Sequence, residues 1–412
     1  MKTYSISALL AAGLMAGFAG SASAADLGGN CCADLEERIA ELEATTARKG
    51  NRKVSLTVSG WVTQNVMYWD DGEESNVYVY DSGETLASNV KFTGSAQISP
   101  EWSAGYVLHL EAIGSDGLLL NQNGSTTPQL LTGVFRGVAV AQSYWYVKSE
   151  KLGKVSVGLV SQASDNTAIL VDGSGSLVPA NFVAFDWNNF GARDAAGNIG
   201  PTLGIGGLAG CSDCNGVPLN AVRYDSPTFG GFSVSASWGE DDFWDVAARY
   251  AGEFSGFKLA VATAYSESRD SVDPFNQLAN TEFWQVGAYV QHVASGLFLY
   301  GAYGDLEDAD DVIAGEDNSF WYLKAGIRGK WTPHGATVLY AEYEQFDNNR
   351  PTAFTTSSEV DLWGLGVVQE IDAAAMSMWL TYRHIESEAN LFGIDIPVQD
   401  FDYVKFGALI NF

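Results

Sequence analysis

The basic residues of this chain are the clearest candidates for a chemical role, because of their positions in a repeating sequence pattern. They occupy polar positions in segments where apolar and polar residues alternate. The nine such residues are Lys91, Lys148, Lys154, Arg223, Arg249, Lys258, Lys324, Arg328 and Arg383. Fixed cationic groups on one wall attract anions and tune ion selectivity. That chemistry requires a scaffold that gathers them on the same face.

The long polar segment 162–218 supplies the opposite charge. Its charged residues are mainly acidic, namely Asp165, Asp172, Asp186, Asp194 and Asp213, with the single basic residue Arg193. A connection of this length far exceeds what a hairpin needs, so it can fold back into an enclosed space. Facing a basic wall, Asp165, Asp172 and Asp186 would produce a transverse field across a constriction. The alternative is that these carboxylates are ordinary solvated loop residues.

The remaining reactive residues do not form a catalytic or metal site. Cys211 and Cys214 are spaced to close a small disulfide, whereas the pairing of Cys31 and Cys32 stays open. A redox-active role for Cys211 and Cys214 would require a neighbouring βαβ pattern, which the sequence around them does not have. The four histidines are scattered, no Ser-His-Asp or Cys-His grouping is suggested, and the glycines of 204–210 lack the flanking elements of a nucleotide site. We therefore expect no enzyme activity, no metal and no cofactor.

The composition excludes one class of partner. The chain has 50 acidic against 22 basic residues and a net charge of −28, which argues against binding to nucleic acid. Charged residues make up only 17% of the sequence, against about 25% in typical soluble domains. Aromatic residues are abundant, with 12 Trp, 18 Tyr and 21 Phe.

The N-terminal region differs from everything that follows it. Residues 1–24 combine Lys2, an apolar run and a small-residue cleavage site, as in a secretory signal peptide. Residues 25–52 then form a separate segment with a short amphipathic helix at 33–47, either an oligomerising stub or a surface helix. No later apolar run approaches the ~20 residues of a transmembrane helix.

From residue 53 to 412 the hydrophobic period is two, which predicts β-strands. We expect sixteen, an even number, and the last ends the chain on Phe412. They span 53–69, 89–98, 102–113, 139–149, 154–161, 219–225, 231–239, 243–250, 256–266, 282–291, 296–304, 319–329, 335–346, 358–370, 373–385 and 401–412.

Two further patterns identify these strands as a transmembrane barrel. The connections alternate between long and short, with 240–242 as the one exception in length, as in a barrel with short periplasmic turns and long outer loops. Rings on the apolar face gather at both strand ends and bracket an aliphatic band, which is typical of two membrane interfaces. These rings are Tyr68, Trp238, Trp244, Tyr265, Trp284, Trp321 and Tyr343 at one end, and Phe232, Tyr250, Phe257 and Phe412 at the other.

Physical constraints then predict an all-β, closed, antiparallel barrel with a water-filled lumen. An unpaired strand edge is prohibitive in hydrocarbon, so 401–412 must pair with 53–69. Sixteen strands enclose a space too wide for side chains to fill, and Lys405 should point into its water. Lys91, Lys324 and Arg383 should lie near mid-barrel, close to the level of His109 and Glu111, with the other cations nearer the periplasmic mouth.

Some strand faces resist assignment from the pattern. In 296–304 and 358–370 both faces are apolar, and our hypothesis is that the surplus surface contacts a neighbouring subunit. Several inward aromatics are candidates for a substrate track, but they form no evident continuous path: Tyr144, Tyr146, Phe283, Tyr289 and Tyr322.

Four stretches resemble the general porins of alphaproteobacteria: residues 31–62, 90–98, 222–238 and the closing YVKFGALINF at 403–412. The resemblance implies a homotrimer of sixteen-stranded barrels, passive diffusion of ions and small hydrophilic solutes, and a third loop folded into each pore. It matches 33–47 to a periplasmic segment, and it makes Phe412 resemble the terminal signal read by the barrel-assembly machinery.

We therefore expect an outer-membrane diffusion porin of a Gram-negative bacterium. The alternatives are a substrate-selective channel with a site in the lumen and a surface adhesin with a narrow or plugged barrel. The acidic clusters 70–74 and 305–311 lack the spacing of an EF-hand. Either they are merely solvated, or divalent cations bridge them to anionic outer-leaflet lipid such as lipopolysaccharide.

Overall fold

The computed structural model describes most of the chain after the N-terminal region. The described ranges are 54–112, 114–124, 137–240, 242–272, 278–308, 317–349, 357–391 and 393–412. The predicted signal peptide (1–24), the predicted helix (33–47), Cys31 and Cys32 lie outside them. Within these ranges the helical elements are short 3-10 turns, and no helix is long and apolar enough to cross a membrane.

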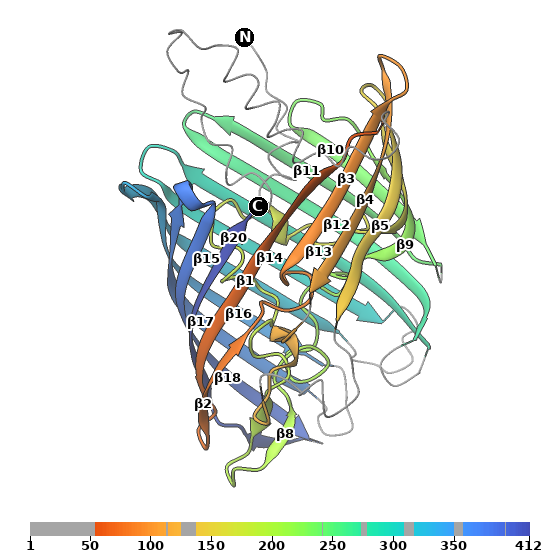
Figure 1. The fold of residues 1–412 in the computed structure, drawn as a ribbon. Coiled ribbons are helices and arrows are strands. Elements are labelled where there is room, and N and C mark those ends of the chain that lie inside the picture. Colours follow the sequence, from red (N-terminus) through yellow and green to blue (C-terminus); the bar gives the residue numbers. More distant parts are fainter. Residues whose placement is uncertain are drawn as a thin grey trace.

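Sixteen antiparallel strands form a closed barrel, as the sequence predicted (Figure 1). Each strand pairs with the next along the chain, and β1 also pairs with β20 to close the ring, in register from Trp61 opposite Asn411 to Asp70 opposite Asp402. The barrel strands are β1 (Thr57–Asp70), β3 (Asn89–Gln97), β4 (Trp102–Ala112), β5 (Val138–Ser149), β6 (Gly153–Val160), β9 (Leu219–Asp225), β10 (Phe232–Gly239), β11 (Trp244–Phe254), β12 (Phe257–Val272), β13 (Leu278–His292), β14 (Leu297–Asp308), β15 (Asn318–Thr332), β16 (Gly335–Asn348), β17 (Ser357–Ile371), β18 (Met376–Leu391) and β20 (Phe401–Asn411).

Four shorter strands lie outside this ring of sixteen. β2 (Ser75–Tyr80) pairs with the end of β1, and β19 (Ile394–Pro397) pairs with the end of β18, so both extend the sheet at the long-loop end. β7 (Gly191–Arg193) and β8 (Ile199–Thr202) form a separate hairpin within the long connection between β6 and β9. We call that connection, residues 161–218, the pore loop.

Alternation along β1 shows how the sequence separates the two faces of the barrel. Val62 and Tyr68 are 55% and 47% exposed, whereas Thr63 and Met67, on the other face, are fully buried. The exposed face meets lipid, because side chains of a strand alternate between the two sides of the sheet. Aromatic pairs join neighbouring strands on this outer face, namely Trp244–Tyr265, Trp284–Tyr303, Trp321–Tyr343 and Trp363–Tyr382 at the long-loop end and Phe232–Tyr250 at the short-turn end.

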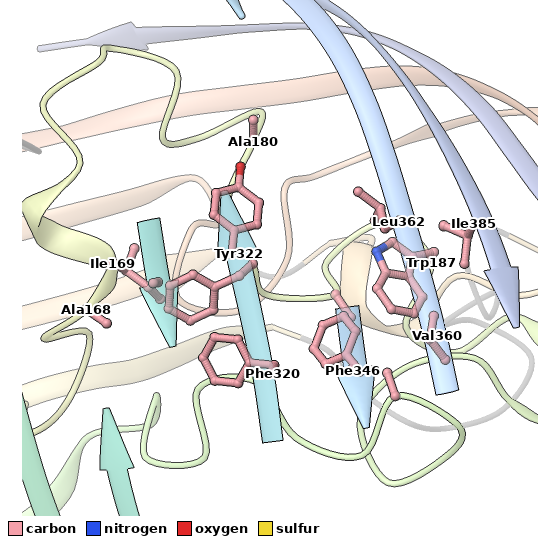
Figure 2. Close-up of a cluster of buried hydrophobic side chains, with 14 of the residues drawn as sticks. Ala168, Ile169, Ala180, Trp187, Phe320, Tyr322, Phe346, Val360, Leu362 and Ile385 are labelled. Atoms are coloured by element: carbon pink, nitrogen blue, oxygen red, sulfur yellow. The ribbon is translucent and has the colours of Figure 1, made fainter. Parts of the chain in front are cut away.

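The hydrophobic core lies inside the barrel, between the pore loop and one side of the lumen wall. Figure 2 shows Trp187 of the loop among Phe346, Val360, Leu362 and Ile385, which come from β16, β17 and β18. All five side chains are buried. The loop is therefore packed against the wall through an apolar interface rather than suspended in water.

This core explains the strands in which both faces are apolar. The inward residues Phe298 and Tyr300 of β14, and Val360 and Leu362 of β17, belong to the buried cluster beneath the pore loop. The outward residue Trp363 is 41% exposed. The pore loop therefore accounts for the apolar residues on the inward face of these strands. Contact of their exposed outward face with a neighbouring subunit stays a prediction.

Candidate functional site

Lys324 fixes the first part of the pore loop to the wall. Its Nζ lies 2.6 Å from Oδ2 of Asp172 and donates to the carbonyl oxygen of Ala180 at 2.7 Å. Both charged side chains are fully buried. The ammonium also lies 5.7–5.9 Å from the ring centroids of Tyr300, Tyr322 and Tyr340, within the range of cation–π attraction.

Lys405 fixes the middle of the pore loop. Its Nζ lies 2.5 Å from Oδ2 of Asp186, and that carboxylate also accepts hydrogen bonds from Tyr80 at 2.5 Å and Tyr403 at 3.2 Å. Lys405 is 4% exposed. Our expectation that Lys405 points into water was wrong: it faces the lumen, but the loop covers it and supplies a counter-ion.

Arg383 completes the row of buried cations. Its guanidinium binds both carboxylate oxygens of Glu342 at 2.8 and 2.9 Å and donates to the carbonyl oxygen of Asn181 in the pore loop at 2.8 Å. Glu342 faces Lys324 across the β15–β16 register. This inward carboxylate was not predicted from the sequence, although the alternation of Tyr340, Glu342 and Glu344 along the strand places it on the lumen face.

These contacts change the expected constriction. Lys324 and Arg383 were predicted to line an aqueous pore opposite Asp172 and Asp186, but all four side chains are buried and paired. The reason is that the apolar residues of the loop exclude water from this wall, and a buried charge is costly unless it is paired and hydrogen-bonded. The pairs hold the loop in place instead of facing each other across open water.

The beginning of the pore loop is held by a second group of cations. Arg223 pairs with Asp225 at 2.8 Å and donates to the carbonyl oxygen of Gln162 at 2.9 Å. Arg249 donates to the carbonyl oxygen of Ala163 at 2.6 Å and to the hydroxyl of Thr167 at 2.9 Å. The predicted pore residues Arg223 and Arg249 thus orient the loop where it leaves β6.

Three other predicted loop residues also lie close to this place. Asp165 is buried near the start of the loop, and Cys211 and Cys214 are joined by a disulfide with an S–S distance of 2.13 Å. Asp213, between the two cysteines, lies within 3.5 Å of the Gln285 amide on β13. The disulfide therefore closes a small turn that rests on the wall.

At the long-loop end, Arg193 of the pore loop binds Asp71 and Glu74, a contact that the sequence did not reveal and that we call the latch. Nε of Arg193 donates to Oδ2 of Asp71 at 2.8 Å, and the same guanidinium lies 3.3 Å from Glu74. Burial alone raises the pKa of Asp71, but hydrogen bonds from Arg193, the backbone of Glu74 and Gln122 outweigh it, so this pKa is lowered. Asp71 of the 70–74 cluster is thus tied to the pore loop, whereas Glu73 and Glu74 are exposed.

The open part of the lumen lies at the short-turn end. A cavity of about 1610 Å³, which we call the inner vestibule, is lined by the turns after β13 and β17, by the ends of β1, β15 and β20 nearest those turns, and by part of the pore loop between 172 and 179. Its cationic lining residues are Lys91, Lys258, Arg328 and Lys330, and its acidic ones are Asp172, Glu370 and Asp372.

The inward aromatic residues do not form a track through this space. Phe283, Tyr289 and Tyr322 are 2%, 4% and 1% exposed, because the pore loop covers them. Tyr144 and Tyr146 are half-buried on β5, across the barrel from those three. The other predicted cations Lys148 and Lys154 pair with Glu150 and Asp225 near the short-turn end.

Within the described residues, no group of three or more His, Cys, Asp or Glu side chains is arranged to hold a metal ion. His109 and Glu111 are buried on β4, and the His109 ring nitrogens have no hydrogen-bond partner there. What the described lumen offers is a shaped aqueous space with charged walls.

Comparison with known proteins agrees with this architecture. The sequence profile described as Gram-negative porin matches residues 8–390. No curated protein sequence matches significantly. Among solved structures, the anion-selective porin from Comamonas acidovorans has a TM-score of 0.56 at 16% identity, covering 87% of this chain and 100% of that one.

Two further structures share the fold at low sequence identity. OmpF of Salmonella typhi, in complex with daunomycin, has a TM-score of 0.54 at 14% identity and covers 88% of this chain and 99% of its own. OmpT of Vibrio cholerae in its trimer form has a TM-score of 0.52 at 11% identity, with coverages of 87% and 99%. At these identities the comparison establishes the fold.

Proposed function

Because this chain belongs to the family of Gram-negative porins and is an outer-membrane channel for passive diffusion, we propose that it is a general diffusion porin without catalytic activity. Ions and small hydrophilic solutes move through it down their gradients. The channel requires no cofactor for this, since the barrel itself supplies the aqueous path.

One observation carries the proposal of a diffusion pore without a specific solute-binding site. The pore loop narrows a sixteen-stranded barrel but leaves the inner vestibule open at the short-turn end. Specific sites bury a ligand among converging polar groups, whereas most charges on the loop-covered wall already bind one another. The buried aromatics also leave no stacking path for a sugar, which weighs against a substrate-selective channel.

Conductance of the purified protein in planar bilayers tests this proposal. We expect large, ohmic single-channel steps that increase in proportion to salt concentration and are not blocked by any one sugar or amino acid. Saturation by a single solute would instead support the substrate-selective channel. Absence of steps in protein that is folded by circular dichroism would overturn the pore itself and favour an adhesin.

We further propose that the chain assembles as a homotrimer and that residues 1–24 are cleaved on export. The trimer form of OmpT of Vibrio cholerae and the resemblance of 31–62 and 403–412 to alphaproteobacterial porins support this assignment. Cross-linking of the detergent-extracted protein and N-terminal sequencing of the mature chain test the two statements separately. Monomers alone, or a retained residue 1, would contradict them.

Carboxylates on the outer face of the barrel, near its long-loop end, support the proposal that it binds outer-leaflet lipid. Glu282 lies opposite Glu307, and Asp347 lies opposite Glu359, both pairs just beyond the outer ring of tryptophans. Like charges directly opposite each other destabilise a sheet. Divalent cations that bridge these groups to lipopolysaccharide phosphates would relieve this repulsion.

Chelation tests the lipid contact. We expect EDTA to lower the dissociation temperature of trimers extracted with lipopolysaccharide, and added Mg²⁺ to restore it. An unchanged temperature would contradict the bridging role. Within the 70–74 cluster, Asp71 should contribute little to the effect, because it is buried against Arg193.

The last strand supports recognition by the barrel-assembly machinery. The backbone of Phe412 exchanges two hydrogen bonds of 3.1 Å with Gly60 at the seam, while its side chain is 60% exposed on the outer face. Deletion of Phe412 should therefore reduce the amount of inserted porin more than the conductance of each trimer that forms. Equal amounts in the outer membrane would contradict this role.

A further inference from the structure

We propose that the inner vestibule gives this channel a preference for small anions, and that Lys91 and Lys258 set it. The inference rests on the proposed diffusion function and names the class of solute that it favours. Its basis is the state of each charge that borders the lumen.

Among the Lys and Arg residues that the structure describes, these two alone have neither an ion pair nor a hydrogen bond. The remainder bind carboxylates or, for Arg249, backbone and hydroxyl oxygens. Lys91 and Lys258 also both line the inner vestibule. Their charges therefore act on the aqueous path rather than on a protein partner.

The carboxylates of the same cavity are already compensated. Asp172 binds Lys324, Glu370 binds Arg328 at 2.6 Å, and Asp372 lies 3.5 Å from Lys330. The negative charge of each of these three acids is therefore balanced by its cationic partner. The cavity retains an excess of positive charge.

The nearest further acids weaken this excess but do not remove it. Glu253 lies opposite Lys258 in the register of β11 and β12, and Glu111 lies two residues from His109, the partner of Lys91 on β4. Neither carboxylate forms an ion pair with the lysine, and neither lines the cavity. Lys91 is the more enclosed of the two lysines.

The two lysines also lie on distant parts of the wall. Lys91 is on β3, next to β1, and Lys258 is on β12, with β4, β5, β6, β9, β10 and β11 between them along the ring. An ion crossing the vestibule thus passes between two free cations. This arrangement places selectivity at the short-turn end, whereas the cations under the pore loop are neutralised.

Reversal potentials of the full-length porin in a KCl gradient test the inference. We expect the wild-type protein to favour chloride, and Lys91→Gln or Lys258→Gln to lower the chloride-to-potassium permeability ratio about fourfold each, because one charge about 10 Å away in water changes the local concentrations of the two ions about twofold in opposite directions. The double variant K91E/K258E should favour potassium. The preference of the wild type should fade at about 1 M salt, where the screening length falls to about 3 Å.

The matched controls separate charge from structure. K330Q/D372N removes a complete pair from the same cavity and should leave the ratio unchanged, as should K151Q outside it. A wild-type preference for potassium, a ratio that does not depend on salt, or an unchanged ratio in Lys91→Gln would overturn the inference. Those outcomes leave ohmic conductance intact, whereas absence of conductance defeats the diffusion function itself.

Discussion

The two sides of the lumen wall follow the same strand pattern but meet different surroundings. On β17 the inward residues Val360, Leu362 and Val368 are at most 1% exposed, because the pore loop lies on them. On β3 the inward residues Ser95 and Gln97 are exposed, and Lys91 is half-buried beside the inner vestibule.

This difference shows what decides the role of a charge inside a barrel. Under the loop, a cation such as Lys324 is a structural anchor, because water is excluded and a counter-ion is required. Beside the vestibule, Lys91 borders the cavity and has no counter-ion, so its charge remains available to passing ions. A position on the lumen-facing side of a strand does not by itself show whether a cation anchors the pore loop or sets ion selectivity.

The strongest test of the covered side is removal of its central carboxylate. Asp186→Ala leaves Lys405 buried without a counter-ion and removes the acceptor of Tyr80 and Tyr403, which should destabilise the loop by about 3–5 kcal/mol. We expect larger and noisier single-channel conductance and protease cleavage within 161–218. Val217→Ala, near the end of the same loop where the side chain is 59% exposed, is the control and should change neither measurement.

The apolar interface predicts a somewhat smaller effect on the same loop. Leu362→Ala removes a fully buried side chain from beneath Trp187 and should cost about 3 kcal/mol. Leu365→Ala on the opposite face of β17, where the side chain is 53% exposed, should be nearly neutral because lipid fills the space. Equal loss of thermal stability in the two variants would contradict the assignment of the faces.

The disulfide of the loop should matter less than its wall contacts. C211S/C214S opens only a short turn, so we expect a loss of about 2 kcal/mol in loop stability. Conductance should stay unchanged, because the anchors at Lys324 and Lys405 remain. A clear increase in conductance on mild reduction of the wild type would show that the disulfide, rather than the wall, holds the loop.

The latch at the long-loop end predicts the smallest effect, which depends on pH. The pKa of Asp71 lies below its usual 3.8 in the folded protein, so the latch is complete above that value and is lost as the pH falls through the lowered pKa. Asp71→Asn keeps one acceptor oxygen and should cost about 1–2 kcal/mol. Wild-type cleavage by pepsin near 193 should increase as the pH falls below 3.8, whereas D71N should be cleaved to a similar extent across this range.

The barrel was predictable because its pattern is local. Period-two alternation, the alternation of long and short connections and the aromatic rings each depend on short stretches of sequence, and together they specified all sixteen strands. The closing strand illustrates this: its pairing with β1 follows from its alternation and from the need to satisfy every backbone group in lipid.

The candidate site was only partly predictable, since contacts between distant segments determine it. Sequence parity placed Lys324, Arg383 and Lys405 toward the lumen, but it did not reveal that Phe182, Trp187 and other loop residues would cover them. It also missed the pair of Asp71 and Arg193, which are separated by 122 residues. No local period connects such positions.

The sequence by itself thus determined the class of protein, the number of strands and the face that each charge occupies, because hydrogen bonding and lipid contact impose a simple repeat. Tertiary structure decided which inward charges are buried and which remain free in the inner vestibule. The physical reason is that the cost of a charge depends on whether water reaches it, and only the path of the pore loop settles that.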